Sequence, residues 1–380
     1  MIIESLLRPE IGIMARVRFE DGAFVGHQGA LLAHYLQIAN KNKWLACVFD
    51  PKEVDVENKM LTGYVLSHMD RDADETIVKA TFSLPKVIYD QILSRKYETA
   101  KAIAAKRHFL RKHAVIFNDG YFNKWEVFEW LSEVQELADH LPRTTSYSPV
   151  HLKEFCAMYP VIFIKPIHGS LGRGIIKLTH QEEGWQAMIR QKYAIKEMKS
   201  AGDCELINDY LTTRAAKKPY LLQEGIALLE VDHRPLDIRV LLQKNERGEW
   251  KRSKTYIRLA AKGEFVSNLS SGGEAFAITV LKGELPIPAY ERMRKELKNL
   301  VKLLPDVIEQ KSKRTLGELG FDFGVDQAGH VYLLEVNSKP RKNVETSRGT
   351  LQLVERALER PLLYAMYLYA GSRRTLKKGV

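Results

Sequence analysis

The chain has 380 residues, of which 45% are hydrophobic and 28% charged, a composition typical of a soluble globular protein with two or three domains. It contains no apolar run of roughly 18 residues and no basic leader before an apolar segment, which disfavours a membrane-spanning helix and a secretory signal. The net charge of +11 favours anionic partners, and three widely spaced cysteines fit neither a disulfide framework nor a zinc signature, so the cytoplasm is the default location.

The first hundred-odd residues alternate strand-like and helical patterns. Apolar runs at residues 11–17, 44–49 and 114–117 have the character of strands, and residues 29–40 have helical spacing. This alternation predicts a small α/β domain over residues 1–120.

Basic residues concentrate in two segments, residues 86–112 and the tail at 373–378. In the first segment they are interleaved with apolar residues, as in an amphipathic helix with a solvated basic face. The chain has no recognised nucleic-acid module, so specific nucleic-acid binding is not expected.

The rest of the chain is predicted to contain helices and strands before a final hairpin. Helical spacing marks residues 123–131 and 291–304, and residues 141–145 have the composition of a linker. Apolar, strand-like runs occur at residues 161–166, 174–178, 220–224 and 237–242.

A glycine-rich loop joins the strands predicted at 161–166 and 174–178. Its three glycines and Ser170 let the backbone approach a ligand and direct N–H groups at an anion, while Lys165 adds a compact positive charge. This composition indicates a phosphate cradle, although the ending of a Walker A loop and its helix are absent. The alternative for the loop is an ordinary glycine-rich hairpin. His168, inside the loop, would contact the phosphate, and the alternative is that it is an exposed loop histidine.

The final hairpin consists of residues 320–325 and 331–337. A loop from Gln327 to His330 would place Asp322 opposite Glu335, with Asn337 on the same face as Glu335 and with Leu334 and Val336 on the other face. Facing carboxylates repel each other unless a cation lies between them. Two acids and an amide therefore predict a Mg²⁺ site completed by nucleotide phosphates, and the alternative is a polar face that meets solvent.

Four motifs carry a resemblance to a known family. In their order they resemble the ATP-grasp superfamily, and in particular its YheC/YheD-like branch of endospore coat-associated proteins, over about residues 115–345. The motifs are Lys165-Pro166 with the glycine loop, Gln223-Glu224-Gly225-Ile226, Asp237-Ile238-Arg239, and Asp322 followed by Glu335-Val336-Asn337-Ser338-Lys339-Pro340.

The resemblance implies an ATP-grasp fold of α/β and α+β parts, with ATP between the last two of its domains. The implied parts are a Rossmann-like pre-ATP-grasp domain at 1–120, a helix and linker at 121–150, a small α+β lid at 151–225, and a C-terminal α+β domain with the metal hairpin at 226–380.

The resemblance also implies a role for each candidate site residue. The phosphates would be contacted by Lys124, Lys165 and the mobile loop residues Gly169, Ser170, Gly172 and Gly174, and the adenine by Gln223, Glu224, Gly225 and Ile226. Asp237 would hold the ribose, with Asp232 as a competitor, and Asp322, Glu335 and Asn337 would bind Mg²⁺ or Mn²⁺. Arg239 and Arg258 would stabilise the acyl phosphate, and the loop at Asn268 and 270–273 would contact the substrate.

The implied function is an ATP- and Mg²⁺-dependent ligase that joins a carboxylate to an amine or a thiol through an acyl phosphate, in the cytoplasm or associated with the endospore. A nucleotide-binding or structural coat protein without turnover and an ATP-grasp kinase are the alternatives. Two features depart from the family pattern. Arg341 and Lys342 follow Pro340, which suits an anionic acceptor or narrows the site, and Gly320 precedes the first metal carboxylate where many ligases have a nearby arginine.

Overall fold

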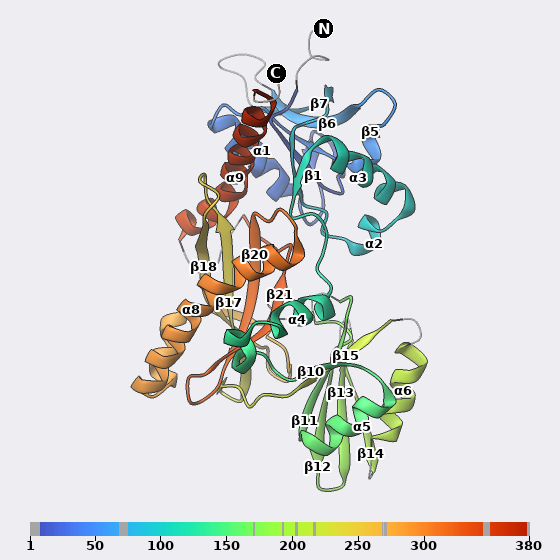
Figure 1. Ribbon diagram of the computed structural model, residues 1–380, viewed down its shortest axis with the longest axis vertical. Coiled ribbons are helices and arrows are strands. Elements are labelled where there is room, and N and C mark those ends of the chain that lie inside the picture. The colour runs from blue at the N-terminus through green and yellow to red at the C-terminus, as the bar shows by residue number, and fades with distance from the viewer. Residues whose placement is uncertain are drawn as a thin grey trace.

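The computed structural model describes residues 8–67, 75–169, 172–191, 194–201, 204–215, 218–267, 269, 272–344 and 350–377. Besides a small two-stranded sheet, the described residues form three large sheets that follow one another along the long axis of the molecule. The N-terminal sheet is at the top of Figure 1, and the sheet built from the middle of the chain, here called the central sheet, is at the bottom. This arrangement has the mixed α/β and α+β content that the sequence predicts. Within the described residues, none of the helices is long and apolar enough to cross a membrane.

The N-terminal sheet has the order β5-β6-β4-β1-β8-β9, with β7 paired to β6. Four neighbouring strands, β4, β1, β8 and β9, run parallel and are largely buried, and α1 and α3 form the helical crossovers from β1 to β4 and from β8 to β9. The elements are β1 (Ile11–Met14), β2 (Phe19–Glu20), β3 (Ala23–Phe24), α1 (Gly29–Lys41), β4 (Ala46–Phe49), η2 (Pro51–Glu53), β5 (Val54–Asp55), β6 (Met60–Ser67), β7 (Thr76–Ser83), β8 (Val87–Asp90), α2 (Arg95–Glu98), α3 (Lys101–His113) and β9 (Val115–Phe117).

The basic segment at 86–112 is not the single amphipathic helix that its composition predicts. It contains β8 and two helices, because the apolar residues at its start belong to the parallel sheet. One of its basic residues, Arg107, is buried and pairs with Asp90, Glu98 and Asp119. In the tail at 373–378, the side chains lie outside the described residues.

The central sheet is antiparallel, with the order β10-β15-β11-β12-β13-β14, and two helices cover one of its faces. Because side chains alternate along a strand, Ile162 and Ile164 of β11 pack under the helices while Phe163 and Lys165 face the opposite way. The elements are β10 (Thr144–Ser146), α5 (Pro149–Met158), β11 (Val161–Pro166), β12 (Ile176–Gln181), β13 (Gly184–Arg190), β14 (Ile195–Ala201), α6 (Glu205–Ala215) and β15 (Tyr220–Glu224).

The C-terminal sheet has the order β19-β18-β17-β20-β21, with β16 paired to β17. The helix α8 packs against it through buried residues three or four apart, among them Met293, Leu297, Leu300 and Leu304. The elements are α4 (Lys124–Ser132), η3 (Gln135–His140), β16 (Glu230–Val231), β17 (Arg234–Lys244), β18 (Trp250–Leu259), β19 (Glu274–Phe276), η5 (Ile278–Val280), α7 (Leu281–Glu284), α8 (Ile287–Ser312), β20 (Glu318–Val325) and β21 (Val331–Asn337).

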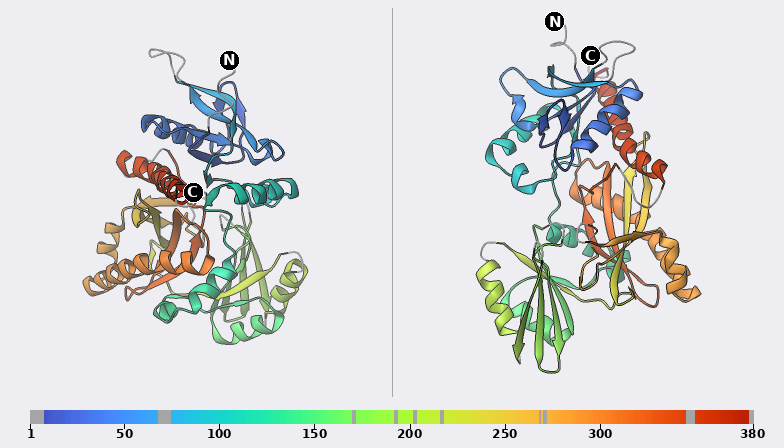
Figure 2. Two further views of the ribbon diagram at one scale, coloured as in Figure 1. Left: turned by 45° about the horizontal axis from the view of Figure 1, so that its top comes forward. Right: turned by 180° about the vertical axis from the view of Figure 1, so that it is seen from behind.

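The last helix, α9 (Leu351–Lys377), returns to the N-terminal sheet. Its residues Val354, Leu358 and Leu362 share one hydrophobic core with β1 and α1, and Figure 2 shows the helix running from beside the C-terminal sheet to the N-terminal part. The last helix is therefore packed against the N-terminal sheet, and the exact division into domains stays a prediction.

Candidate active site

A cavity of about 1580 Å³ lies between the bare face of the central sheet and the C-terminal sheet, and it reaches the N-terminal part. It brings together almost all of the residues that the sequence singles out. Its lining includes Lys124, Lys165, Gly169, Gly172, Gln223, Glu224, Gly225, Ile226, Asp237, Arg239, Arg258, Asp322, Glu335 and Asn337.

The remaining candidates are placed differently. Gly174 lies near the end of the loop between β11 and β12, with a positive φ of 77°, and its N–H donates to the Arg190 carbonyl oxygen at 2.8 Å. Ser170, Asn268 and the serines at 270 and 271 lie outside the described residues. Asp232, the competitor for the ribose role, is in the turn between β16 and β17 with a φ of 52°.

The metal hairpin pairs Asp322 directly with Glu335, as the sequence predicts, but for a different reason. The loop is one residue longer than expected, because Val325 pairs with Val331. A bulge in β21 then accommodates the extra residue and restores the pairing of the two acids. The bulge also explains why Leu334, expected on the opposite face, lines the cavity beside Glu335.

Three cations, Lys124, Arg239 and Arg258, surround the facing carboxylates. Lys124 pairs with Glu335, and Arg239, which lies opposite Asp322 on the neighbouring strand, pairs with Asp322. An arginine thus stands beside the first metal carboxylate after all, supplied by β17. Gly320 leaves the space for it, since a Cβ there would lie only 3.1 Å from Nη2 of Arg239.

Arg258 links the two buried aspartates. It donates to both oxygens of Asp237, at 2.7 and 2.5 Å, and its Nη2 lies 3.0 Å from Asp322. Burial opposes the charged form of Asp322, but Arg239 and Arg258 outweigh it and lower the pKa of that residue to about 2. At Asp237 burial prevails over Arg258 and raises the pKa to about 6. The hydroxyl of Ser267 also donates to Asp237.

The side chains of Asp322, Glu335 and Asn337 fit a hard divalent cation. They offer carboxylate and amide oxygens from two adjacent strands, and the Asn337 amide lies 3.4 Å from Asp322. Oxygen ligands of this kind are what Mg²⁺ and Mn²⁺ prefer.

At the other side of the cavity, Lys165 lies among polar groups of β15. Its Nζ donates to the Gln223 side-chain oxygen at 2.5 Å, and the Gln223 amide donates to Thr144 at 3.1 Å. Burial, reinforced by nearby Lys124, lowers the pKa of Lys165 to about 8. Glu224 accepts from the Arg143 N–H at 2.8 Å, so its side chain fixes the linker to the end of β15.

Several residues of the cavity were missed by the sequence. Met188, on β13, lines the cavity. Lys254, Arg95 and Tyr121 also line it, and the alternation of Lys254, Tyr256 and Arg258 along β18 is the signal that could have found the first of these. Both members of the basic pair after Pro340 line the cavity, and Nζ of Lys342 lies 2.6 Å from Glu318, with which it forms an ion pair.

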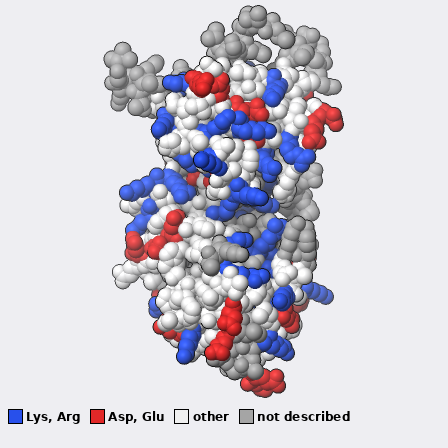
Figure 3. Space-filling view, turned by 90° about the vertical axis from the view of Figure 1, so that its right-hand side faces the viewer, with Lys and Arg blue, Asp and Glu red and all other residues white. Residues whose placement is uncertain are grey.

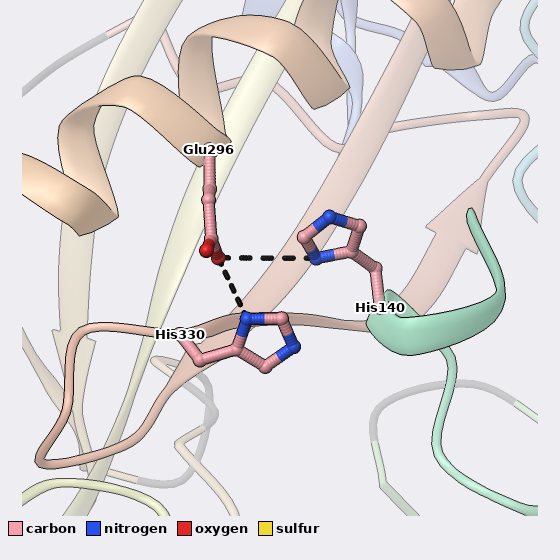
Figure 4. Close-up of side chains that lie close together, drawn as sticks. All are labelled: His140, Glu296 and His330. Atoms are coloured by element: carbon pink, nitrogen blue, oxygen red, sulfur yellow. Dashed lines mark ion pairs between the residues drawn. The ribbon is translucent and has the colours of Figure 1, made fainter. Parts of the chain in front are cut away.

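A second cluster, His140, Glu296 and His330, has the ligand types of a metal site (Figure 4). However, Arg292 already supplies a positive charge, with its Nη2 2.9 Å from Nδ1 of His330 and its Nε donating to Glu296 at 2.8 Å. Nδ1 of His140 is engaged 2.7 Å from the Val331 carbonyl oxygen. The cluster is therefore best described as a contact that fixes α8, η3 and the hairpin loop to one another.

Known proteins resemble the chain along most of its length. A family model described as YheC/D-like ATP-grasp matches residues 113–368. The endospore coat-associated protein YheD of Bacillus subtilis is 28% identical over 326 residues, which are 84% of this chain and 70% of YheD. The endospore coat-associated protein YheC of the same organism is 24% identical over 306 residues, 78% of this chain and 82% of YheC.

Two solved structures share the fold. D-alanyl-alanine synthetase A from Vibrio cholerae aligns with a TM-score of 0.51 at 13% identity, covering 96% of this chain and 100% of that protein. D-alanine–D-alanine ligase from Bacillus anthracis aligns with a TM-score of 0.50 at 12% identity, covering 96% and 99%.

Proposed function

The chain belongs to the YheC/D-like ATP-grasp family, and we propose that it is an ATP- and Mg²⁺-dependent ligase that joins a carboxylate to an amine or a thiol. The observation that carries this proposal is the convergence of three oxygen ligands, Asp322, Glu335 and Asn337, with Arg239 and Arg258 in one cavity. The names of two proteins of similar fold, a synthetase and a ligase, agree with it.

The proposed chemistry has two steps. A carboxylate oxygen of the first substrate attacks the γ-phosphorus of ATP, the bond to the bridging oxygen breaks, and ADP leaves. The amine or thiol then attacks the carbonyl carbon of the acyl phosphate, the C–O bond to phosphate breaks, and inorganic phosphate leaves while the nucleophile loses its proton to solvent.

The residues of the cavity act by position and charge in both steps. Lys124 and Lys165 would neutralise the phosphates, and Gly169 and Gly172 would bring backbone N–H groups close to them. Arg239 and Arg258 would stabilise the acyl phosphate. A bound Mg²⁺, held by the oxygen ligands of the hairpin, supplies further positive charge beside the phosphates.

The remaining contacts of the nucleotide belong to the same proposal. The adenine would lie against the end of β15 and the residues that follow it, Gln223 to Ile226. Asp237 would face the ribose, which requires its pairing with Arg258 to be shared or exchanged. We also propose that the protein associates with the endospore, as the names of the two Bacillus subtilis relatives suggest, and that it is made and acts in the cytoplasm, as the composition of the sequence indicates.

One observation favours an alternative without turnover. Both oxygens of Asp322 are already paired with arginines, and Glu335 is paired with Lys124, so the charges balance without a metal ion. Product analysis distinguishes the possibilities. A ligase gives ADP and a new amide or thioester, a kinase gives ADP and a stable phosphorylated product, and a nucleotide-binding coat protein gives neither.

Titration calorimetry of ATP and ADP, with and without Mg²⁺, tests the site directly. We expect Mg²⁺-dependent binding in the wild type that falls at least about tenfold in Glu335→Gln, because a carboxylate ligand is lost. Glu284→Gln is the matched control, since Glu284 is exposed on α7 away from the cavity. A folded wild type that binds no nucleotide would refute the ligase and leave a structural coat protein.

A further inference from the structure

The cavity extends beyond the metal carboxylates toward the N-terminal part, and the far end is positively charged. On β18 the residues Lys254, Tyr256 and Arg258 share the cavity face. Since strand residues rise about 3.3 Å each, Lys254 lies roughly 13 Å along the strand from Arg258. Lys254 is half-buried, forms no ion pair within the described residues, and has a pKa lowered by burial and by nearby Lys342.

A second group of cations closes this end from the N-terminal side. Arg95 stacks on the ring of Tyr121, 4.5 Å from its centre, and Nη1 of Arg341 lies 2.9 Å from Nε2 of His27. All four residues line the cavity. Nε of Arg95 is buried and has no hydrogen-bond partner, and neither arginine forms an ion pair with an acid in the described part of the chain.

Nearby acids do not neutralise this group, because other cations already use them. Glu318 accepts two hydrogen bonds from Lys342, at 2.6 and 2.7 Å. Asp90 and Glu98 pair with Lys339 and Arg107. Of the cations at this end of the cavity, Arg95, Lys254 and Arg341 are those that form no ion pair with an acid in the described part of the chain.

The cavity is large enough to hold a substrate in addition to a nucleotide. Its 1580 Å³ exceeds the roughly 300–1,000 Å³ of a site for one small molecule, so it has room for a second substrate beside a nucleotide. Figure 3 shows Lys and Arg side chains gathered around the narrow middle of one face of the molecule. A partner with several negative charges would match three cations that come from three separate parts of the chain.

We propose that the end of the cavity lined by Arg95, Lys254 and Arg341 binds carboxylates of the first substrate other than the carboxylate that attacks ATP. We propose that this substrate is an acidic peptide. This assignment rests on the proposed ligase function. The planar guanidinium groups of Arg95 and Arg341 fit carboxylates in a two-point contact, and Lys254 adds a point charge.

Binding of two short peptides tests the proposal. The probes are hexaglutamate and hexaglutamine, titrated by calorimetry into the full chain at about 0.15 M salt, with and without Mg²⁺ and ADP. We expect hexaglutamate to bind at least about tenfold more tightly, because charge-assisted hydrogen bonds are roughly twice as strong as neutral ones. Arg95→Gln, Lys254→Gln and Arg341→Gln should each weaken it by about three- to tenfold.

The controls separate this site from non-specific attraction and from the nucleotide site. Lys298→Gln removes the same charge from an exposed position on α8 and should change the affinity by less than about twofold. Arg341 is exposed, so its variant is expected to fold. Each cavity variant should bind Mg²⁺ and ADP as the wild type does. A wild type that binds no nucleotide would refute the ligase function. The peptide titrations without nucleotide test the anion site independently of that result.

Three results would overturn the proposal. The first is equal affinity for the two peptides, and the second is a loss in Lys298→Gln as large as the loss in the cavity variants. The third is a phosphoserine hexapeptide that binds more tightly than hexaglutamate, because phosphate rather than carboxylate would then be the recognised group.

Discussion

Two lysines of the cavity differ in their immediate partners. Lys124 is paired with a carboxylate, that of Glu335, whereas Lys165 donates to the neutral amide oxygen of Gln223. An amide oxygen compensates less of the desolvation of an ammonium group than a carboxylate does. Burial therefore lowers the pKa of Lys165 to about 8, close enough to neutrality for its charge to change under ordinary assay conditions.

This charge predicts how nucleotide affinity depends on pH. Below its pKa of about 8 Lys165 is positively charged and attracts the phosphates, and above it the charge is lost. Between pH 7 and 9 the charged fraction falls about tenfold, so the dissociation constant of Mg²⁺-ADP should rise by up to about tenfold. Calorimetry across this range measures it. Lys165→Arg stays charged and should remove the dependence, and a flat wild-type profile would contradict the prediction.

At the scale of the element, the edge where β15 leaves the central sheet depends on one glycine. The N–H of Gly225 donates to the Val161 carbonyl oxygen at 2.8 Å, which brings the two backbones together. A Cβ on Gly225 would lie 2.4 Å from Cγ1 of Val161 and 2.9 Å from its carbonyl oxygen. No rotation of the Val161 side chain relieves the contact with the backbone, so the strand end itself would have to move.

Gly225→Ala should therefore both destabilise the protein and disturb the proposed adenine contact. We expect a loss of about 1–3 kcal/mol in the free energy of unfolding, as in overpacked sites, and weaker binding of ADP. Gly283→Ala is the matched control, because nothing lies within 4 Å of a Cβ at that helical glycine. Urea denaturation and calorimetry of both variants measure the two effects, and equal stability of the two variants would refute the argument.

The sequence predicts elements well where one period dominates a segment. The hairpin is an example, since the alternation in residues 320–325 and 331–337 and the turn between them are visible in the residues alone. The bulge that restores the pairing of Asp322 and Glu335 is not visible, because it depends on how β20 also pairs with β17. The local pattern was also misleading for the basic segment at 86–112, where the burial of β8 in a sheet prevails over helical spacing.

The candidate site shows the same limit. The residues of the four motifs could be predicted to lie together from their resemblance to a family. Arg95, Lys254 and Arg341 could not, because they are far apart in sequence and meet only when the N-terminal part, β18 and the segment after β21 enclose one cavity. Their lack of acid partners becomes visible only once Glu318 and Asp90 are seen to pair elsewhere.

At the scale of the whole molecule, a buried polar network holds the N-terminal sheet to the C-terminal sheet. Glu318 on β20 accepts from Tyr89 of β8 at 2.5 Å, from Gln243 of β17 at 3.0 Å and from Lys342. Asn118 adds to the junction, since its side chain donates to the carbonyl oxygens of Glu318 and Ser338 at 2.7 and 2.6 Å. The strand that carries the metal ligands is thus anchored to the N-terminal part.

This junction predicts a large effect of a residue outside the proposed chemistry. Lys342→Met should cost about 3–5 kcal/mol of unfolding free energy, because it leaves the fully buried carboxylate of Glu318 without a compensating charge. The double variant Lys342→Met with Glu318→Gln should recover more than half of that loss, since the uncompensated charge is gone.

Because Glu318 bridges two sheets, the Lys342→Met variant should also unfold less cooperatively, with a lower dependence of the free energy of unfolding on urea concentration. Urea denaturation measures both quantities, with exposed Lys298→Met as the control. A single variant as stable as this control would mean that the hydrophobic packing of α9 on the N-terminal sheet, rather than the buried ion pair, holds the two parts together.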